Sequence, residues 1–319
     1  DQKTIEVCYG WYKQKSISVV IPAFNEENLI KNTVDGIPDF IDKIIVVNDA
    51  SKDSTSTVVQ KLVNSNEKIH LINHEKNLGV GGAIASGYKW SRDNEFDISV
   101  VMAGDAQMDP SDLPNLLDEI IENGADYAKG NRMLTPNVRK SMPKLRFFAS
   151  QVLSLLTKIA SGYWNIIDPQ CGYTAINKKT LKKIDWDKLY KRYGQPNDLL
   201  VKLNVANAIV RDVEIKPIYN IGEKSGIKYG RLIFSLSWLL FKDFLWRIKE
   251  KYIVKDFHPL VFFYALGAVF FVFTLGLSIR LFYLWWLTGE IPPINALAAM
   301  FTFVSMALFT LFAMWFDMD

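Results

Sequence analysis

Ile17-Ser18-Val19-Val20-Ile21-Pro22-Ala23-Phe24-Asn25-Glu26 is the stretch that decides the fold class, because an apolar run of strand length leads directly into a polar loop. The same succession recurs at Lys43–Asn48, Lys68–Ile72 and Asp97–Met102. Each loop leads into a helix candidate, and strands that alternate with helices are typical of parallel sheets. The sequence therefore predicts an α/β fold with a mostly parallel, doubly wound sheet.

Four polar segments follow these strands. They are Ala23–Glu27, Asp49–Asp53, Asn73–Gly82 and Ala103–Asp109. Ligands of such sheets gather at the carboxyl ends of the strands. We therefore expect the four segments to share one edge of the sheet and to form a binding site.

Asp105 and Gln107 follow the fourth strand and place a carboxylate and an amide oxygen close together. Mg²⁺ and Mn²⁺ prefer oxygen ligands and complete their shells with water and diphosphate oxygens. The pair is a candidate metal site, although an Asp in a loop is more often a turn former or a helix cap. Asp109-Pro110-Ser111 fits that second role, and we predict a turn and a helix start there.

Carboxylates also close the first two strands, Glu26 after the first and Asp49 after the second. Either can hold the hydroxyls of a ribose or the polar atoms of a base, and capping by Asn25 and Asp53 is the alternative use of these loops. Asn77–Gly82 allows close backbone approach and begins a helix where an anionic ligand is favoured. Its spacing fits neither a Walker motif nor a dinucleotide fingerprint.

Two long apolar runs lie near the C-terminus, residues 259–287, interrupted only by Arg280, and residues 294–316, which carry no charge. Each exceeds the roughly 20 residues that cross a bilayer, and the Pro-containing turn between them fits a tight hairpin. We predict a two-helix transmembrane hairpin over residues 258–319, with Arg280 reaching the interface. A helical hairpin buried in a soluble core is the alternative.

Residues 229–257 precede the hairpin and are predicted to form an amphipathic helix region with interspersed aromatic and basic side chains. We expect it at the membrane surface, although its apolar part, Leu232–Phe241, can instead pack on the α/β domain. The segment Lys228–Lys255 holds seven Lys and Arg but only two acidic residues, whereas the hairpin tip holds only Glu290. By the positive-inside rule both termini are then cytoplasmic.

Composition restricts the class of protein further. A net charge of +3 over 319 residues does not indicate a nucleic-acid partner. Cys8 and Cys171 lack a metal-ligand spacing and suggest neither a disulfide framework nor a thiolate metal site. Residues 1–16 form a polar extension without the apolar run of a signal peptide, so the α/β domain, residues 17–228, is expected in the cytoplasm.

Taken together and in this order, five segments resemble glycosyltransferase family 2, whose members have the GT-A fold. They are Val19–Glu26, Val46–Ser51, Asn77–Gly87, Asp105-x-Gln107 and Gly130-Asn131-Arg132. The resemblance is closest to the polyprenyl-phosphate subgroup, which is typified by dolichol phosphate mannose synthase. A helix start that bears Arg146 and a C-terminal hairpin accompany the acidic motif in that subgroup and here.

The resemblance implies roles by position. The nucleotide-binding residues would be Pro22, Phe24, Glu26, Asp49 and Gly79. Asp105 and Gln107 would hold a divalent cation, Mg²⁺ or Mn²⁺, and Arg132 would meet the donor diphosphate or the acceptor phosphate. The implied catalytic residues are Asp105, Arg132 and Arg146. The subgroup has a further Asp where this chain has Ala103, which puts full metal coordination in question.

Two basic clusters supply candidates for the acceptor phosphate, namely Arg139, Arg146, Lys224 and Arg231. A solvated or lipid-facing basic surface explains these clusters equally well. Asp198 stands where many family members place a catalytic carboxylate, and capping of a helix is its alternative role.

These features imply an enzyme that transfers a hexose with inversion from a GDP- or UDP-linked donor to polyprenyl or dolichyl phosphate. It would act at the cytoplasmic face of a plasma membrane or an endoplasmic-reticulum-type membrane. A lipid phosphate is already anionic, so Asp198 is not needed as a base. A polysaccharide synthase is disfavoured because the Gln-x-x-Arg-Trp motif is absent from the sequence. Ala103 keeps a non-catalytic nucleotide-binding membrane protein open as the second alternative.

Overall fold

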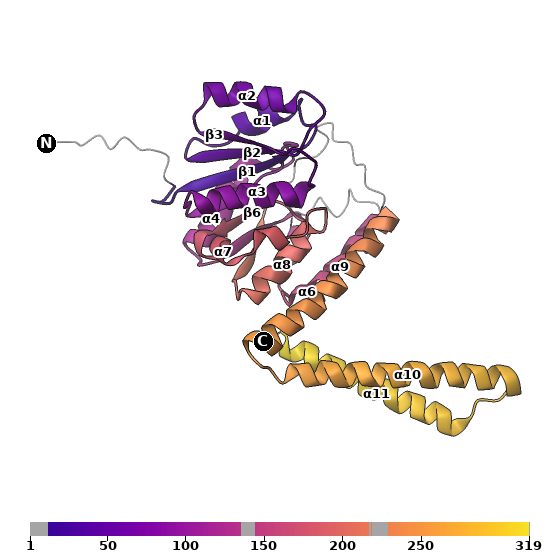
Figure 1. Cartoon of the computed structure of the whole chain (residues 1–319). Helices are drawn as coiled ribbons and strands as arrows, with labels where there is room; N and C mark the ends of the chain where they lie inside the picture. Colours follow the sequence, from indigo (N-terminus) through magenta and orange to yellow (C-terminus); the bar gives the residue numbers. More distant parts are fainter. Residues whose placement is uncertain (1–11, 135–143, 217, 219–228, 319) are drawn as a thin grey trace. The chain divides into compact units, whose positions relative to one another are not determined.

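The computed structural model describes residues 12–134, 144–216, 218 and 229–318, without the side chains of residues 144–149 and 229–233 (Figure 1). The chain divides into two compact units, Asp1–Asp243 and Phe244–Asp319. The first holds the sheet and the second holds the two long apolar helices. The finer division of the chain into four segments stays a prediction.

The first unit is built on a seven-stranded mixed sheet with the order β3-β2-β1-β4-β6-β5-β7. Its strands are β1 (Ile17–Ala23), β2 (Lys43–Asn48), β3 (Ile69–Asn73), β4 (Ile98–Val101), β5 (Tyr127–Asn131), β6 (Thr174–Asn177) and β7 (Val210–Glu214). Only β6 runs antiparallel to its neighbours β4 and β5, while the other pairs are parallel. The four predicted strands are confirmed, and six strands end at the same edge.

Helices cover both faces of this sheet (Figure 1), which explains why the central strands are apolar on both sides. On one face, Val19, Val46 and Val100 pack with side chains of α1 (Ile30–Asp35), α2 (Thr55–Ser65) and α4 (Leu113–Ile121). On the other, Val20 and Ile45 pack with side chains of α3 (Val80–Asp93), α7 (Lys178–Lys183) and α8 (Gln195–Val205). A Cβ at Gly87 would lie 2.2 Å from Val20 Cγ1, so this glycine allows α3 to approach β1.

The first unit also holds α6 (Lys144–Ser161) and the N-terminal part of α9 (Tyr229–Lys249). Leu236 and Leu239 of α9 are buried, and a Cβ at Gly194 would lie within 3 Å of both. The alternative expectation, that this apolar part packs on the α/β domain, therefore holds for one side of the helix. Trp238 and Phe241 on α9 are about half exposed, at 57% and 51%.

The second unit contains two helices long and apolar enough to cross a membrane, α10 (Leu260–Thr288) and α11 (Pro293–Phe316), with mean hydropathies of 2.4 and 2.1. Both predicted spans agree with these helices to within one residue at each end. The ring of Phe263 of α10 lies at a tilt against the rings of Phe309, Phe312 and Phe316 of α11, with centroids 5.5–6.3 Å apart. Gly289, in the left-handed conformation, ends α10.

A buried ion pair between Arg247 and Asp317 connects two helices of this second unit. Both oxygens of Asp317 accept hydrogen bonds at 2.7 Å from the guanidinium of Arg247, and Tyr252 donates a third. The side chains of Arg247 and Asp317 are 0% and 1% exposed. The pair joins the end of α9 to the end of α11 across 70 residues of sequence.

Candidate functional site

The four polar segments lie together at the carboxyl edge of the sheet, as predicted, because β1, β2, β3 and β4 are parallel. Two of the loops are directly connected. Asn25, with a positive φ of 58°, accepts a hydrogen bond at its side chain from the Lys52 amide, and Ser51 Oγ accepts one from the Asn25 amide. Asn25 therefore joins the first loop to the second and does not cap the following helix.

Asp49 is buried at the start of the second loop and organises the glycine segment. Its carboxylate accepts hydrogen bonds from the amides of Leu78 and Gly79, at 2.8 and 2.7 Å. His74 Nδ1 lies 2.7 Å from Asp49 Oδ1, and His74 Nε2 lies 2.9 Å from Ser86 Oγ. The anion favoured at the start of α3 is thus the protein's own Asp49.

Gly79 requires its glycine for two reasons. Its φ is +85°, and a Cβ there would lie 2.4 Å from the carbonyl oxygen of Lys191. The same carbonyl accepts hydrogen bonds from the amides of Gly81 and Gly82. The segment around Lys191 therefore covers the glycine turn, and the amides of Gly79, Gly81 and Gly82 are hydrogen-bonded within the protein.

Asp198 supports that covering segment. It is buried at 3% exposure in the first turn of α8, accepts a hydrogen bond from the Tyr190 amide and is paired with Lys202. These contacts give it a positioning role for the segment before α8. No described contact points Asp198 toward the acidic loop.

The acidic loop follows β4 and is held from several sides. Asp105 accepts a hydrogen bond from the Gln107 amide at 3.1 Å, and the Gly104 carbonyl accepts one from Thr33 of α1. The carbonyl of Gln107 accepts one from the Ile218 amide. Asp109 caps the 3₁₀ helix η1 (Pro110–Asp112) through the Ser111 amide, which confirms the predicted turn and helix start.

Glu26 and Asp105 bring two carboxylates near each other at this edge. Burial, followed by the charges of Asp105 and Asp53, raises the pKa of Glu26 to about 7. A divalent cation would relieve this repulsion, and the oxygen donors of Asp105 and Gln107 suit Mg²⁺ or Mn²⁺. Among the described residues, no group of three or more His, Cys, Asp and Glu is arranged to hold a metal ion. The carboxylate of Asp105 and the amide oxygen of Gln107 are oxygen donors of the kind that such a cation takes from a protein.

Arg132 begins the 3₁₀ helix η2 (Arg132–Leu134) directly after β5, at the same edge. Its Nε and Nη2 donate to the two carboxylate oxygens of Asp168, at 2.7 and 3.0 Å. Asp168 is 2% exposed, while the Arg132 side chain keeps 34% of its surface exposed. Asp168 could not be recognised as a site residue from the sequence, because Asp168-Pro169 has the composition of an ordinary turn.

Among the remaining predicted site residues, Pro22 and Phe24 have described side chains. Pro22 lies in β1 near the edge, and Phe24 is 44% exposed in the first loop. Arg146 and Arg231 are described as backbone within α6 and α9. Arg139 and Lys224 lie outside the described residues.

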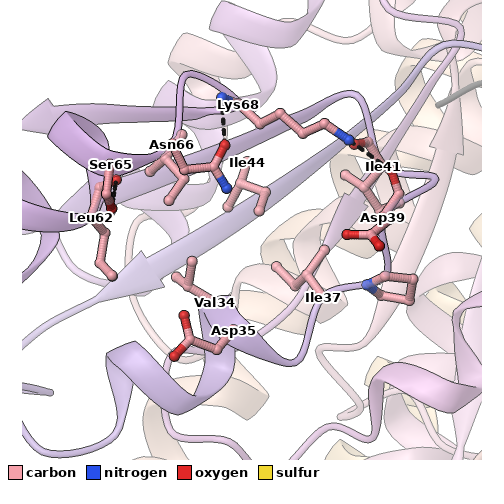
Figure 2. Close-up of a pocket in the computed structure, with 12 residues that line it drawn as sticks. Val34, Asp35, Ile37, Asp39, Ile41, Ile44, Leu62, Ser65, Asn66 and Lys68 are labelled. Atoms are coloured by element: carbon pink, nitrogen blue, oxygen red, sulfur yellow. Dashed lines mark hydrogen bonds between the residues drawn. The ribbon is translucent and has the colours of Figure 1, made fainter. Parts of the chain in front are cut away.

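A cavity of about 460 Å³ lies away from this edge, at the amino ends of β2 and β3 (Figure 2). Ile37, Ile41 and Leu62 are among its apolar lining residues. Lys68 crosses its rim and donates hydrogen bonds to the carbonyls of Asp39 and Ile41. The cavity contains none of the predicted site residues.

The sheet order and the polar carboxyl edge define an α/β fold of the GT-A class. Glucosyl-3-phosphoglycerate synthase from Mycobacterium tuberculosis, solved with Mn²⁺, UDP and glucosyl-3-phosphoglycerate, has the same fold. The two structures superpose with a TM-score of 0.54 at 18% identity, over 74% of this chain and 80% of the synthase.

The sequence match is more specific than the fold. Residues 18–185 match glycosyl transferase family 2, and the chain belongs to this family. It is therefore a glycosyltransferase, as the motifs predicted.

Two relatives illustrate the family. The UDP-N-acetylglucosamine–dolichyl-phosphate N-acetylglucosaminyltransferase of Methanococcus voltae is 34% identical over 218 residues, covering 64% of this chain and 86% of the relative. The undecaprenyl-phosphate mannosyltransferase of Micrococcus luteus is 29% identical over 186 residues, covering 57% of this chain and 75% of that relative.

Proposed function

We propose that this glycosyltransferase moves a hexose from a UDP- or GDP-linked donor onto polyprenyl or dolichyl phosphate, with inversion at the anomeric carbon. The observation that carries the proposal is the placement of Asp105, Glu26 and Arg132 at one edge of the sheet, in a chain that also has two apolar helices of membrane-spanning length. The names of both relatives, which specify dolichyl and undecaprenyl phosphate, support the lipid acceptor.

The reaction needs alignment more than proton transfer. An oxygen of the lipid phosphate forms the new bond to the anomeric carbon, and the nucleoside diphosphate leaves with the electron pair of the broken bond. In-line displacement inverts the configuration, so an α-linked donor gives a β-linked product. The acceptor oxygen is already anionic, and the engagement of Asp198 by Tyr190 and Lys202 agrees with a mechanism without a general base.

Asp105 and Gln107 would hold the cation, Mg²⁺ or Mn²⁺, together with the donor diphosphate. When bound, the cation supplies positive charge to the leaving diphosphate. Arg132 adds a fixed positive charge at the same edge, and Asp49 fixes the glycine segment through the amides of Leu78 and Gly79. Pro22 and Phe24 would contact the nucleoside.

The membrane arrangement is part of the proposal. We assign α10 and α11 to a hairpin with both termini in the cytoplasm, at a plasma membrane or an endoplasmic-reticulum-type membrane. The exposed Trp238 and Phe241 of α9, with Lys242 Nζ 5.9 Å from the Trp238 ring centroid, would lie at the lipid surface. A cysteine at Gly289 should react with an impermeant reagent added outside intact cells, and reaction only after permeabilisation would reverse the topology.

A screen of nucleotide-sugars against a short polyprenyl phosphate tests the function, with the product linkage read by NMR. We expect one donor to give a β-linked lipid-phosphate sugar. Asp105→Ala should abolish transfer while insertion and folding persist, and Ser111→Ala in the neighbouring turn should stay active. Full activity of Asp105→Ala, or of the native protein in excess chelator, would rule out the metal-dependent mechanism.

The acceptor site needs a test of its own. Arg146→Ala should raise KM for the lipid phosphate more than KM for the donor, because Arg146 is proposed to bind the acceptor. A loss of donor affinity with unchanged acceptor kinetics would assign Arg146 to the donor side.

A further inference from the structure

The segment Ile167–Cys171 is held rigidly behind the carboxyl edge by four elements of the first unit. The Ile167 amide donates to Asp212 Oδ2 of β7 at 2.7 Å, and the Ile167 carbonyl accepts from Ser154 Oγ of α6 at 3.1 Å. Gln170 Nε2 donates to Asn197 Oδ1 of α8 at 2.8 Å. The Cys171 carbonyl accepts a hydrogen bond from Lys129 Nζ of β5. Side chains of β7, α6 and β5 therefore contact the backbone on both sides of Asp168, and α8 contacts the segment through the Gln170 side chain.

Within this segment, Asp168 binds Arg132 of the candidate site directly. Besides the two guanidinium contacts, its Oδ2 accepts a hydrogen bond from the backbone amide of Arg132 at 3.3 Å. The Asp168 carboxylate thus fixes both the position of the Arg132 backbone at the end of β5 and the plane of the Arg132 guanidinium. A guanidinium held in this two-point geometry keeps a single orientation.

A buried lysine lies close to the pair. Lys129 is fully buried and lies three residues before Arg132 on β5. Burial alone would raise the pKa of Asp168, but the hydrogen bonds and charge of Arg132, with the charge of Lys129, lower it below the ordinary value. Asp168 is therefore a carboxylate at neutral pH, whereas burial lowers the pKa of Lys129, whose amino group donates to the Cys171 carbonyl.

We propose that Asp168 is a positioning residue, which holds the Arg132 guanidinium at the angle needed to meet phosphate oxygens at the carboxyl edge. The inference rests on the proposed function, in which Arg132 faces a diphosphate or a lipid phosphate. A preorganised cation stabilises charge that develops on these oxygens without having to reorient during the reaction. A mobile arginine would bind the ground state and contribute less to the rate.

Kinetics of Asp168→Asn test this role, because the substitution keeps the shape and removes the charge. We expect kcat to fall about 10- to 100-fold while KM for the nucleotide-sugar changes little. Asp212→Asn is the matched control, since Asp212 anchors the same segment without a described bond to Arg132, and it should retain kcat. An unchanged kcat in Asp168→Asn, or an equal loss in Asp212→Asn, would overturn the inference.

A double-mutant cycle separates positioning from a general structural role. In an Arg132→Ala background, Asp168→Asn should change kcat by less than about twofold, because its partner is already gone. A structural role would lower activity by the same factor in both backgrounds, which contradicts the proposal. Asp168→Glu, which keeps the charge, should recover part of the lost kcat.

Labelling of arginines with phenylglyoxal, read by peptide mass spectrometry, gives a readout that does not need transfer. Arg92 is a built-in reference, because its side chain is 32% exposed but pairs with the exposed Asp93. Arg132 should react several-fold more slowly than Arg92 in the native protein and at a similar rate in Asp168→Asn. Equal labelling rates of Arg132 and Arg92 in the native protein would overturn the proposed positioning of Arg132 by Asp168. Slow labelling of Arg132 in a protein without any transfer activity would refute the proposed function alone.

Discussion

Two Arg–Asp pairs in this chain each form a two-point contact and differ in the exposure of the arginine. In each, a buried aspartate accepts two hydrogen bonds from one guanidinium at 3.0 Å or less. Arg132 at the sheet edge keeps 34% of its surface, whereas Arg247 beneath the apolar hairpin keeps none. The sealed pair can only hold elements together, while the open pair can present its cation to a ligand.

Their surroundings explain the difference. Phe244 and Tyr252 lie 5.9 and 5.8 Å from the Arg247 guanidinium carbon, and Tyr252 also donates to Asp317. Arg132 instead follows a strand at the polar edge of the sheet, where substrate has access. The predictions below test whether one pair serves stability and the other serves catalysis.

The largest effect is expected from Arg247→Ala, which leaves Asp317 buried without its cation. The free energy of unfolding should fall by about 3–5 kcal/mol, measured by unfolding of the detergent-solubilised chain. Lys249→Ala on the exposed side of the same helix is the control and should change it by less than about 0.5 kcal/mol. A comparable loss in both variants would contradict a special role for the sealed pair.

In contrast to Arg247→Ala, Arg132→Ala should cause a large loss of transfer activity and a smaller loss of unfolding free energy. We expect kcat to fall about 10²–10³-fold, equivalent to about 2.7–4 kcal/mol of transition-state stabilisation. Arg92→Ala removes a similarly exposed arginine and should leave transfer intact. If Arg132→Ala mainly lowered stability, the two pairs would have the same role.

Lysine substitutions separate charge from geometry in the two pairs, because Lys keeps the charge but cannot form the two-point contact. Arg247→Lys should lose about 1.5–3 kcal/mol of unfolding free energy, the value of one hydrogen bond to a charged group. Arg132→Lys should lose transfer activity with little change in thermal stability. Full stability of Arg247→Lys would show that charge alone holds the hairpin base.

Asp243 of α9 should give the smallest effect, as a partly buried carboxylate whose Oδ2 atom is buried. Burial, followed by the charge of Asp198, raises its pKa to about 7, and its Oδ2 has no hydrogen-bond partner within the described part of the chain. The folded state therefore binds a proton more tightly than the unfolded state. Stability is greatest below the ordinary Asp pKa and is lost as pH rises toward about 7.

Asp243→Asn should remove the contribution of Asp243 to this pH dependence. Relative to the native protein, the variant should gain about 1 kcal/mol more unfolding free energy at pH 8 than at pH 5, measured by thermal unfolding at both values. Lys242→Gln, next to it on the exposed side of α9, controls for a simple change of net charge. A native protein whose stability is flat between these pH values would show that Asp243 stays ionised without cost.

Several features of this chain were determined by the sequence itself. Apolar runs such as Val19–Ile21 predicted the strands, and the uncharged length of residues 294–316 predicted α11, because strand and span formation depend on local composition and length. The loops after the strands could be assigned to one edge, since parallel strands end on the same side. The family followed from the order of these loops.

Only the tertiary structure decided which side chains meet. The antiparallel direction of β6, the engagement of Asp49 by the glycine turn and the grip of Asp168 on Arg132 depend on contacts between segments that lie 25 or more residues apart. The pairing of Arg247 with Asp317 spans 70 residues. Neither Asp168 nor Asp317 differs in its local sequence from an ordinary turn or helix-end residue. Their roles could not be predicted, because a side chain acquires burial and a charged partner only when the chain folds.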